Sequence, residues 1–300
     1  MRSARASAAA ITSIAGLLLA LAAAGQTPSQ ATPSAEPALA KMVKTEQAFA
    51  ARSLAVGWKQ SFLEYFADDA VGFDGGRTAS ARALVTQQPD PPKELKLVWE
   101  PRYGDIAMSG DLGYLTGPVQ SVNPTRNNGQ PRYSNYLSVW KRQADGSFKV
   151  VMDAGVTTPD AVAFPPGFTQ PRRSTPRTAN AQQGALIKSL RDTDAALTNL
   201  ARASQADAYR GHLADGARMH RTGLMPLVGQ DAIVQWLRSQ LPYASGASLF
   251  ADTSTAGDLG YTYGRYATPG AMPEHGFYVR IWTCGTDGVW RVAVDVLQPQ

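Results

Sequence analysis

A five-residue sequence occurs twice in this chain, and the distance between its copies constrains the fold more than any other feature. Residues 110–114 and 257–261 both read Gly-Asp-Leu-Gly-Tyr, at an offset of 147 residues. Residues 136–153 match residues 278–295 at an offset of 142, and the difference falls in a loop, where an insertion costs little. Solenoid units have roughly 20–50 residues, so this repeat has the size of a whole domain. The chain of 300 residues is therefore predicted to contain two copies of one domain.

We expect the two domains to occupy residues 39–158 and 185–300. The stretch between them, residues 159–184, is rich in Pro, Thr, Arg and Gln and lacks hydrophobic periodicity, which is typical of a linker. Residues 25–38 have a similar composition and are expected to form a disordered linker before the first domain. A linker of this length does not dictate how the domains sit.

The N-terminal residues 1–24 predict export. Arg2 and Arg5 precede an apolar run that ends in small residues, which is typical of a cleaved secretory signal peptide. The strongly apolar part is shorter than the roughly 20 residues that a bilayer span needs. We therefore expect a periplasmic or secreted protein with no membrane anchor after cleavage. Cys284 is the only cysteine, which excludes an intramolecular disulfide.

The net charge gives no support for a nucleic-acid partner. The formal charge is +5, but the signal peptide and the linker between the copies account for +2 each, which leaves the folded parts at +1. The sequence also lacks a basic stripe with interleaved aromatic residues. We therefore expect no binding to nucleic acid.

Each copy begins with helical periodicity and continues with strands. Apolar residues at three- and four-residue spacing, such as Leu39, Met42 and Phe49, predict two helices in each copy, and a short third helix is expected at residues 79–86 and 231–238. The strands expected in the first copy are residues 95–103, 105–109, 112–119, 136–142 and 148–153. Helices followed by strands predict an α+β fold with an antiparallel sheet.

Three segments of the first copy carry a resemblance to a known family. They are Phe-Ala-Asp-Asp-Ala-Val at residues 66–71, the Gly-Asp-Leu-Gly-Tyr turn, and the hairpin at residues 136–153. Together they resemble the NTF2-like superfamily in its DUF4440 or SnoaL-like branches. The resemblance implies two cone-shaped domains, each a curved antiparallel sheet wrapped around N-terminal helices, with an internal pocket. The superfamily contains isomerases, dehydratases, cyclases and binding modules, so it implies a fold rather than a function.

Asp74 is the candidate catalytic residue. Residues 66–74 resemble, in length, the stretch that leads to the catalytic base of ketosteroid isomerases, and a carboxylate at a pocket mouth can move a proton beside a carbonyl. The tyrosine that this family places on its first helix is missing, because Phe49 and Ala50 lie at that distance. The equivalent position in the second copy is Arg221, and an Asp before two glycines is often a turn former.

Two further acidic residues, Asp153 and Asp295, are equivalent positions in the last strand of each copy. Their neighbours are apolar, so each charge needs water, a cavity or a partner. If residues 287–288 form a two-residue turn, Arg280 lies opposite Asp295 and Ser138 opposite Asp153; a three-residue loop with a bulge breaks both pairs. A cross-strand polar pair is the simpler interpretation, and Asp153, Arg280 and Asp295 are also candidates for the pocket.

Four aromatic residues and a histidine complete the candidate ligand-binding set. Trp99, Tyr103, Tyr136 and Trp140 are candidates for an apolar pocket wall, although most aromatic residues are expected in the core. His220 lies beside the position equivalent to the candidate base, so a polar role in the pocket is an alternative to a core or surface histidine. The three histidines lack the spacing of a zinc site. We expect no metal and no cofactor.

The identical pentapeptides are interpreted structurally rather than functionally. Gly110-Asp111 is expected to form a tight turn between two strands, and Gly113 is expected to allow close packing in the following strand.

Three functions remain open. The first is the binding of a small, largely apolar molecule, or an accessory role, by an exported tandem protein. The second is an enzyme of the isomerase or lyase type with Asp74 as general base. The third is an intramolecular pseudo-dimer of the two domains that acts in protein interaction without a ligand.

The substitution Asp74→Asn separates the first two hypotheses. It is expected to abolish turnover without loss of the fold if Asp74 is the base, and to leave ligand affinity nearly unchanged if the protein only binds. Turnover and ligand affinity, measured on the wild type and the variant, check this.

Overall fold

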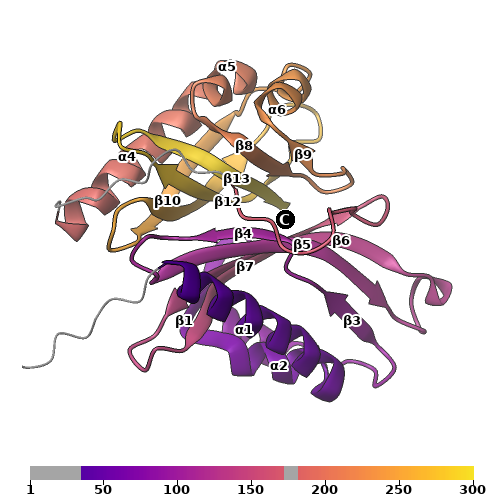
Figure 1. Cartoon of the computed structure of the whole chain (residues 1–300). Coiled ribbons are helices and arrows are strands. Elements are labelled where there is room, and N and C mark those ends of the chain that lie inside the picture. The colour runs from indigo at the N-terminus through magenta and orange to yellow at the C-terminus, as the bar shows by residue number, and fades with distance from the viewer. Residues whose placement is uncertain (1–34, 172–181) are drawn as a thin grey trace, which may run out of the picture. The chain divides into compact units, whose positions relative to one another are not determined.

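Two mixed β-sheets, each preceded by helices, make up the described part of the chain (Figure 1). The computed structural model describes residues 35–171, here called the first half, and residues 182–300, the second half. The expected signal peptide lies outside the described residues, as do residues 172–181 of the expected linker. Within the described ranges, no helix is long and apolar enough to cross a membrane. The expected α+β class is confirmed.

The first half contains a seven-stranded sheet with the strand order β2-β1-β7-β6-β5-β3, in which β4 also pairs with β5. Its elements are α1 (Ala35–Val56), α2 (Trp58–Tyr65), β1 (Phe66–Asp74), β2 (Arg77–Ser80), α3 (Ala81–Gln87), β3 (Lys96–Trp99), β4 (Tyr103–Ile106), β5 (Leu112–Val122), η1 (Asn127–Gly129), β6 (Arg132–Arg142) and β7 (Phe148–Thr158).

The second half repeats this plan in a six-stranded sheet with the order β10-β11-β12-β13-β8-β9. Its elements are α4 (Gln183–Leu200), α5 (Gln205–Arg210), β8 (Leu213–His220), β9 (Leu227–Val228), α6 (Gln230–Leu237), β10 (Ser245–Thr253), β11 (Leu259–Ala267), β12 (His275–Cys284) and β13 (Trp290–Pro299). Neither sheet is purely antiparallel, because β1 pairs with β7, and β8 with β13, in parallel.

The first helix of each half buries one face at helical spacing. An acidic residue interrupts each buried face, Glu46 in α1 and Asp194 in α4. The buried positions, at intervals of three and four residues, include Leu39, Met42, Glu46 and Phe49 in α1 and Leu186, Leu190, Asp194 and Leu197 in α4. Two carboxyl groups are therefore held against the sheets by otherwise ordinary amphipathic helices.

Both expected linkers are shorter than the composition predicts. Helix α1 begins at Ala35, inside the stretch assigned to residues 25–38. Residues 159–171 pack against the first half: Phe164 and Phe168 contact its apolar core, and the Thr169 backbone N–H donates to the carbonyl of Arg102 at 2.9 Å. Aromatic anchors and a backbone hydrogen bond thus order a Pro-rich stretch that has no periodicity of its own.

The expected cross-strand pairs form, but for a different reason. Ser138 lies opposite Asp153 and Arg280 opposite Asp295. The turns are not the assumed two-residue ones, since the last pair before the second turn is Cys284 with Trp290. A β-bulge between Ile281 and Trp282, and its counterpart between Val139 and Trp140, shifts the register by one residue and restores both pairs.

The identical pentapeptides have the turn geometry that was expected. Gly110 and Gly257 have φ angles of 64° and 69°, in the left-handed region that favours glycine. Gly113 and Gly260 lie where another residue approaches closely: a Cβ on Gly113 would come within 2.6 Å of Met42, and one on Gly260 within 2.5 Å of Leu190. In each half, the first helix (α1 or α4) therefore packs directly on the second glycine of the pentapeptide.

Each pentapeptide also accepts a hydrogen bond from the turn next to the other pentapeptide. Asp111 Oδ2 accepts the backbone N–H of Thr255 at 2.9 Å, and Asp258 Oδ2 accepts the backbone N–H of Met108 at 3.0 Å. Met108 and Thr255 are themselves equivalent at the offset of 147 residues. The exchange is reciprocal, as in an isologous dimer interface, and it gives a second physical reason for the identity of the two sequences.

One of the two apolar core clusters spans both halves, while the sheets stay separate. The core cluster of the first half includes Ile281, Val294 and Val296 of the second half. The rings of Phe73 and Phe277 stack with their centroids 4.1 Å apart. Among the described strands, none joins the sheet of the other half. Apolar side chains of the second half thus pack in a cluster with those of the first half, while a second cluster consists of second-half residues alone.

Replacing Gly113 by Ala is expected to destabilise the fold by about 1–3 kcal/mol, because the new methyl group would also meet the Asp105 carbonyl oxygen at 2.8 Å. Urea unfolding followed by tryptophan fluorescence measures this. Gly155→Ala in β7 is the matched control, since its Cβ would lie 3.7 Å from the nearest atom, and a change within about 0.5 kcal/mol is expected. Equal effects of the two substitutions would contradict the packing argument.

Candidate functional site

A cavity of about 270 Å³ in the first half lies between the helices and the sheet. Its walls include the aromatic side chains of Phe49 on α1, Phe62 on α2, Trp99 on β3 and Tyr136 on β6. Two carboxyl groups, those of Glu46 on α1 and Asp153 on β7, also line it. Apolar walls with a few convergent polar groups are typical of a small-molecule site.

Glu46 is fully buried and is held by two indole rings. Its Oε1 accepts a hydrogen bond from Trp99 Nε1 at 2.6 Å, and its Oε2 accepts one from Trp140 Nε1 at 2.8 Å. Burial raises the pKa of Glu46 to about 8; the nearby charge of Asp153 acts in the same direction, and the indole donors oppose it. At neutral pH the protonated form of this carboxyl group is therefore favoured.

Asp153 faces the cavity from the last strand of the sheet. Its Oδ1 accepts a hydrogen bond from the Ser138 hydroxyl at 2.8 Å, and Ser138 also interacts with Glu46. Burial raises the pKa of Asp153 to about 7, against the lowering effect of the Ser138 hydrogen bond. Ser138 thus lies between two carboxyl groups that both titrate near neutral pH.

The hydroxyl group of Tyr136 is a further polar group of the cavity. It is buried and has no hydrogen-bond partner among the described residues. Burial raises the pKa of Tyr136 well above its ordinary value, and Glu46, Asp153 and Glu100 add to this effect. A buried donor without a partner costs about 1–3 kcal/mol, so a ligand with an acceptor or a water molecule would stabilise this site.

Chemically, the pair Glu46 and Asp153 can donate and accept protons near neutral pH. Carboxyl groups with raised pKa values in a cavity are typical of general acids and bases, and also of sites that recognise a charged or polar ligand. Within residues 35–171 and 182–300, no group of three or more His, Cys, Asp or Glu residues is arranged to hold a metal ion.

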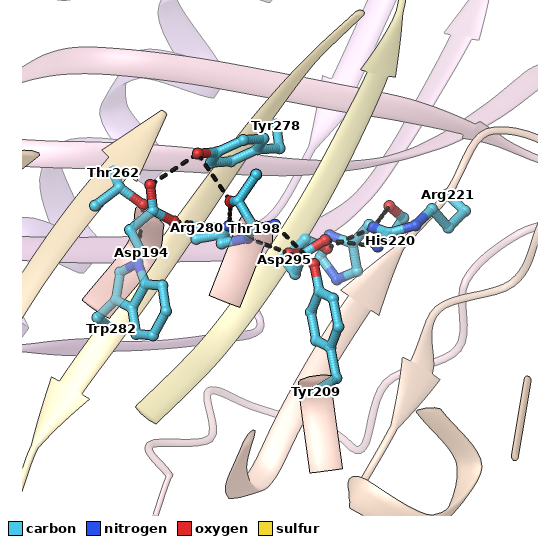
Figure 2. Close-up of polar contacts among 10 residues, drawn as sticks. All are labelled: Asp194, Thr198, Tyr209, His220, Arg221, Thr262, Tyr278, Arg280, Trp282 and Asp295. Carbon is cyan, nitrogen blue, oxygen red and sulfur yellow. Dashed lines mark hydrogen bonds and ion pairs between the residues drawn. The ribbon is translucent and has the colours of Figure 1, made fainter. Parts of the chain in front are cut away.

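The corresponding region of the second half is filled by a buried ionic network (Figure 2). The Arg280 guanidinium lies between two carboxylates, with Nη1 at 2.7 Å from Asp194 Oδ1 and Nε at 2.8 Å from Asp295 Oδ2. It also donates to the hydroxyl oxygens of Thr198 at 2.9 Å and Tyr209 at 3.0 Å. All three charged groups are fully buried, so this region is packed with side chains.

A second arginine completes the charge balance of this network. Arg221 Nη2 lies 2.7 Å from Asp295 Oδ1, and both side chains are buried. The arginines lower the pKa of Asp295, although burial alone would raise it. Two guanidinium groups thus face two carboxylates in the second half, which satisfies the requirement that buried charges be paired.

The structure brings together only part of the predicted site. Trp99, Tyr136 and Asp153 line the cavity of the first half, and Trp140 bonds to Glu46 behind its wall. Arg280 and Asp295 are paired as the sequence predicted, but in the filled core of the second half.

Three predicted site residues lie elsewhere. Asp74 is exposed at the end of β1, opposite Arg77 in a hairpin, so the structure does not support it as a base in a pocket; the two glycines after it make a turn, as their positive φ angles require. Tyr103 packs under the Arg218 guanidinium, 4.3 Å from the ring centroid.

His220 is a buried histidine rather than a cavity residue. Both of its ring nitrogens lie 3.2 Å from Asn135 Nδ2. Burial lowers the pKa of His220 to about 3, and the charges of Arg218 and Arg221 add to this. The ring is therefore neutral at physiological pH.

Glu46 is a residue of the candidate site that was not predicted from the sequence. A signal existed, because Glu46 falls at the helical spacing of Met42 and Phe49 on the buried face of the predicted first helix. An acidic residue at such a position has to find a partner or a cavity. Only Asp74, Asp153 and Asp295 were considered as candidate carboxylates.

No family model matches the chain, and no curated protein matches it. Three solved structures show the range of those that resemble it. A protein of unknown function from Mycobacterium tuberculosis has 15% identity over 39% of this chain and 78% of its own, with a TM-score of 0.34. An epoxide hydrolase of the same organism has 14% identity over 40% and 83%, with a TM-score of 0.31. A scytalone dehydratase candidate from Novosphingobium aromaticivorans has 8% identity over 39% and 85%, with a TM-score of 0.32.

The pKa of Glu46 predicts a stability that falls with rising pH. Between its ordinary pKa of 4.5 and its folded-state value of about 8, the folded protein binds more protons than the unfolded chain, so deprotonation favours unfolding. Asp153, whose pKa is raised to about 7, acts in the same direction, and the neutral His220 has the opposite effect, mainly below its ordinary pKa of 6.5. Between pH 7 and 8 the free energy of unfolding is therefore expected to decrease, by up to about 1.4 kcal/mol per pH unit.

Urea unfolding at several pH values checks this. Glu46→Gln should reduce the slope between pH 7 and 8 and leave the smaller contribution of Asp153. Glu64→Gln is the control, because the pKa of Glu64 is lowered to about 2 by its hydrogen bond with Arg52, and it should leave the slope unchanged. The same slope in wild type and Glu46→Gln would refute the assignment.

Proposed function

We propose that the first half binds a small molecule with an apolar body in the cavity beside Glu46 and Asp153. The single observation that carries this proposal is the contrast between the halves: the region that Arg280 fills in the second half is an aromatic-walled cavity of about 270 Å³ in the first. A cavity of this size suits a molecule of one to three rings, and the carboxyl groups would fix its orientation.

The proposal extends to the location and domain organisation of the whole chain. It describes an exported protein, periplasmic or secreted, built as a tandem of NTF2-like domains of the DUF4440 or SnoaL-like kind. Supporting it are the two sheets of matching strand order, the helices before each sheet and the signal-like N-terminal sequence.

A second candidate function is acid–base catalysis of the isomerase or lyase type. The observation that favours it is the presence of two cavity carboxyl groups with pKa values of about 8 and about 7. In this version Glu46 and Asp153 take the roles that the sequence suggested for Asp74. One would donate a proton while the other accepts one.

A role for the duplication itself is compatible with either function. The reciprocal hydrogen bonds of Asp111 and Asp258 and the shared apolar core favour an intramolecular pseudo-dimer. In this arrangement the second half, with its packed ionic core, acts as a scaffold for the first.

Blocking the cavity tests the binding proposal. Val119 lines the cavity, so Val119→Trp should fill part of it and weaken binding of the neutral fluorophore N-phenyl-1-naphthylamine at least tenfold. Val98→Trp is the matched control, because Val98 is 46% exposed on the neighbouring strand and should leave the affinity unchanged. Fluorescence titration measures both variants.

Mass spectrometry of small molecules retained by the protein, purified from its native host, gives an independent test. Molecules retained by the wild type and by Val98→Trp, but lost from Val119→Trp, are the expected result. A fluorophore that binds all three proteins equally would refute the cavity as the binding site.

A further inference from the structure

The second half shows what a pair of facing carboxyl groups binds in this fold. At the offset of 142 residues, Tyr136 corresponds to Tyr278 and Ser138 to Arg280. The strand register agrees, since Ser138 lies opposite Asp153 just as Arg280 lies opposite Asp295. Bulges at matching places in both hairpins keep the equivalence exact along the strands.

The carboxyl groups on the first helices are also equivalent. Met42 and Leu190 pack against the second glycines of the two pentapeptides, Gly113 and Gly260. Glu46 follows Met42 by four residues, and Asp194 follows Leu190 by four. One helical turn separates each pair, so both acidic side chains start from matching positions above their sheets.

The two halves therefore differ at the position of Ser138, which Arg280 occupies in the second half. In the second half, Arg280 bridges the two carboxylates with hydrogen bonds of 2.7 and 2.8 Å. In the first half, the shorter side chain of Ser138 contacts both carboxyl groups but carries no charge, and the cavity lies beside it. The volume that a guanidinium group occupies in one half is open in the other.

The aromatic partner of the guanidinium is retained. Arg280 lies over the Tyr278 ring, 3.9 Å from its centroid, which is a close cation–π contact. Tyr136 takes the same register position, and a Cβ on Gly117 would come within 3.2 Å of its ring, as one on Gly264 would clash with Tyr278. The same kind of close glycine packing therefore fixes both rings.

At the equivalent positions, the first half has no cation that balances the charges of its two carboxyl groups. Two arginines, Arg280 and Arg221, offset Asp194 and Asp295. The groups that act most on the pKa values of Glu46 and Asp153 are indoles, a hydroxyl and the other carboxyl group, and none of these is a cation. The facing groups that titrate are Glu46 on α1, Asp153 on β7 and Tyr136 on β6, with Glu100 acting on Tyr136.

We infer that the cavity of the first half selects a planar monocation of the amidinium or guanidinium type, carried on an apolar body. This inference rests on the proposed function, because it names the class of ligand for that same cavity. The cation would lie between Glu46 and Asp153 and against the ring of Tyr136, and the apolar body would contact Phe49, Phe62 and Trp99. One carboxylate would neutralise the cation, and the other group could keep its proton.

Benzamidinium is a suitable probe, with benzamide as its neutral isostere and benzoate as its anionic one. Calorimetric titration of the wild type at pH 8 should show benzamidinium binding at least tenfold more tightly than either analogue. Its affinity should rise several-fold from pH 6 to pH 8, because ionising a carboxyl group in this window creates the partner of the cation.

Two variants locate the binding. The double variant Glu46→Gln with Asp153→Asn should lose at least tenfold in benzamidinium affinity while still binding N-phenyl-1-naphthylamine. The substitution Ser138→Arg places the bridging side chain of the second half in the first, and it should abolish benzamidinium binding. Should the double variant fail to fold, Ser138→Arg and the pH dependence of the wild type decide the question.

The outcomes separate this inference from the proposed function. Three results would each overturn the cation assignment: benzamide that binds as tightly as benzamidinium, a benzamidinium affinity that does not change with pH, or undiminished benzamidinium binding to Ser138→Arg. This holds even if the neutral fluorophore binds the wild type and Val119→Trp blocks that binding. A wild type that binds neither the fluorophore nor any of the three benzene derivatives would overturn the proposed function itself.

Discussion

Each half of this protein places two carboxyl groups between its first helix and its last strand, and the packing around them depends on how they are neutralised. Removing a carboxylate from water costs several kcal/mol unless it is paired, bonded or protonated. The second half pairs Asp194 and Asp295 with buried arginines. The first half uses indole and hydroxyl donors and raised pKa values instead.

This difference explains why the region beside Ser138 is a cavity, whereas the region around Arg280 is packed with side chains. A guanidinium group hydrogen-bonded to two carboxylates and two hydroxyl groups fixes the core of the second half, since removing Arg280 would leave the buried Asp194 without its ion-pair partner. The first half keeps a cavity and two carboxyl groups able to change their protonation state. The reciprocal bonds of Asp111 and Asp258 and the shared apolar core connect the permanently paired half to the half with the open cavity.

Sequence reasoning reached the hairpin pairs but not their cause. Ser138 with Asp153 and Arg280 with Asp295 were expected from a two-residue turn, whereas longer turns and a compensating bulge produce them. Glu46 was overlooked because its role depends on Trp99 and Trp140, which are distant in the sequence. Asp74 was favoured by a resemblance in segment length, and a local hairpin placed it in solvent.

The sequence by itself determined the duplicated α+β plan, the helix faces and the tight turns, because these follow from repetition, periodicity and the conformational freedom of glycine within short segments. Only the tertiary structure decided which carboxyl groups meet, which half is filled and which is hollow. The physical reason is that burial and charge pairing are properties of side chains brought together from separate elements. At one equivalent strand position, Ser138 lines the cavity of the first half and Arg280 lies in the packed core of the second.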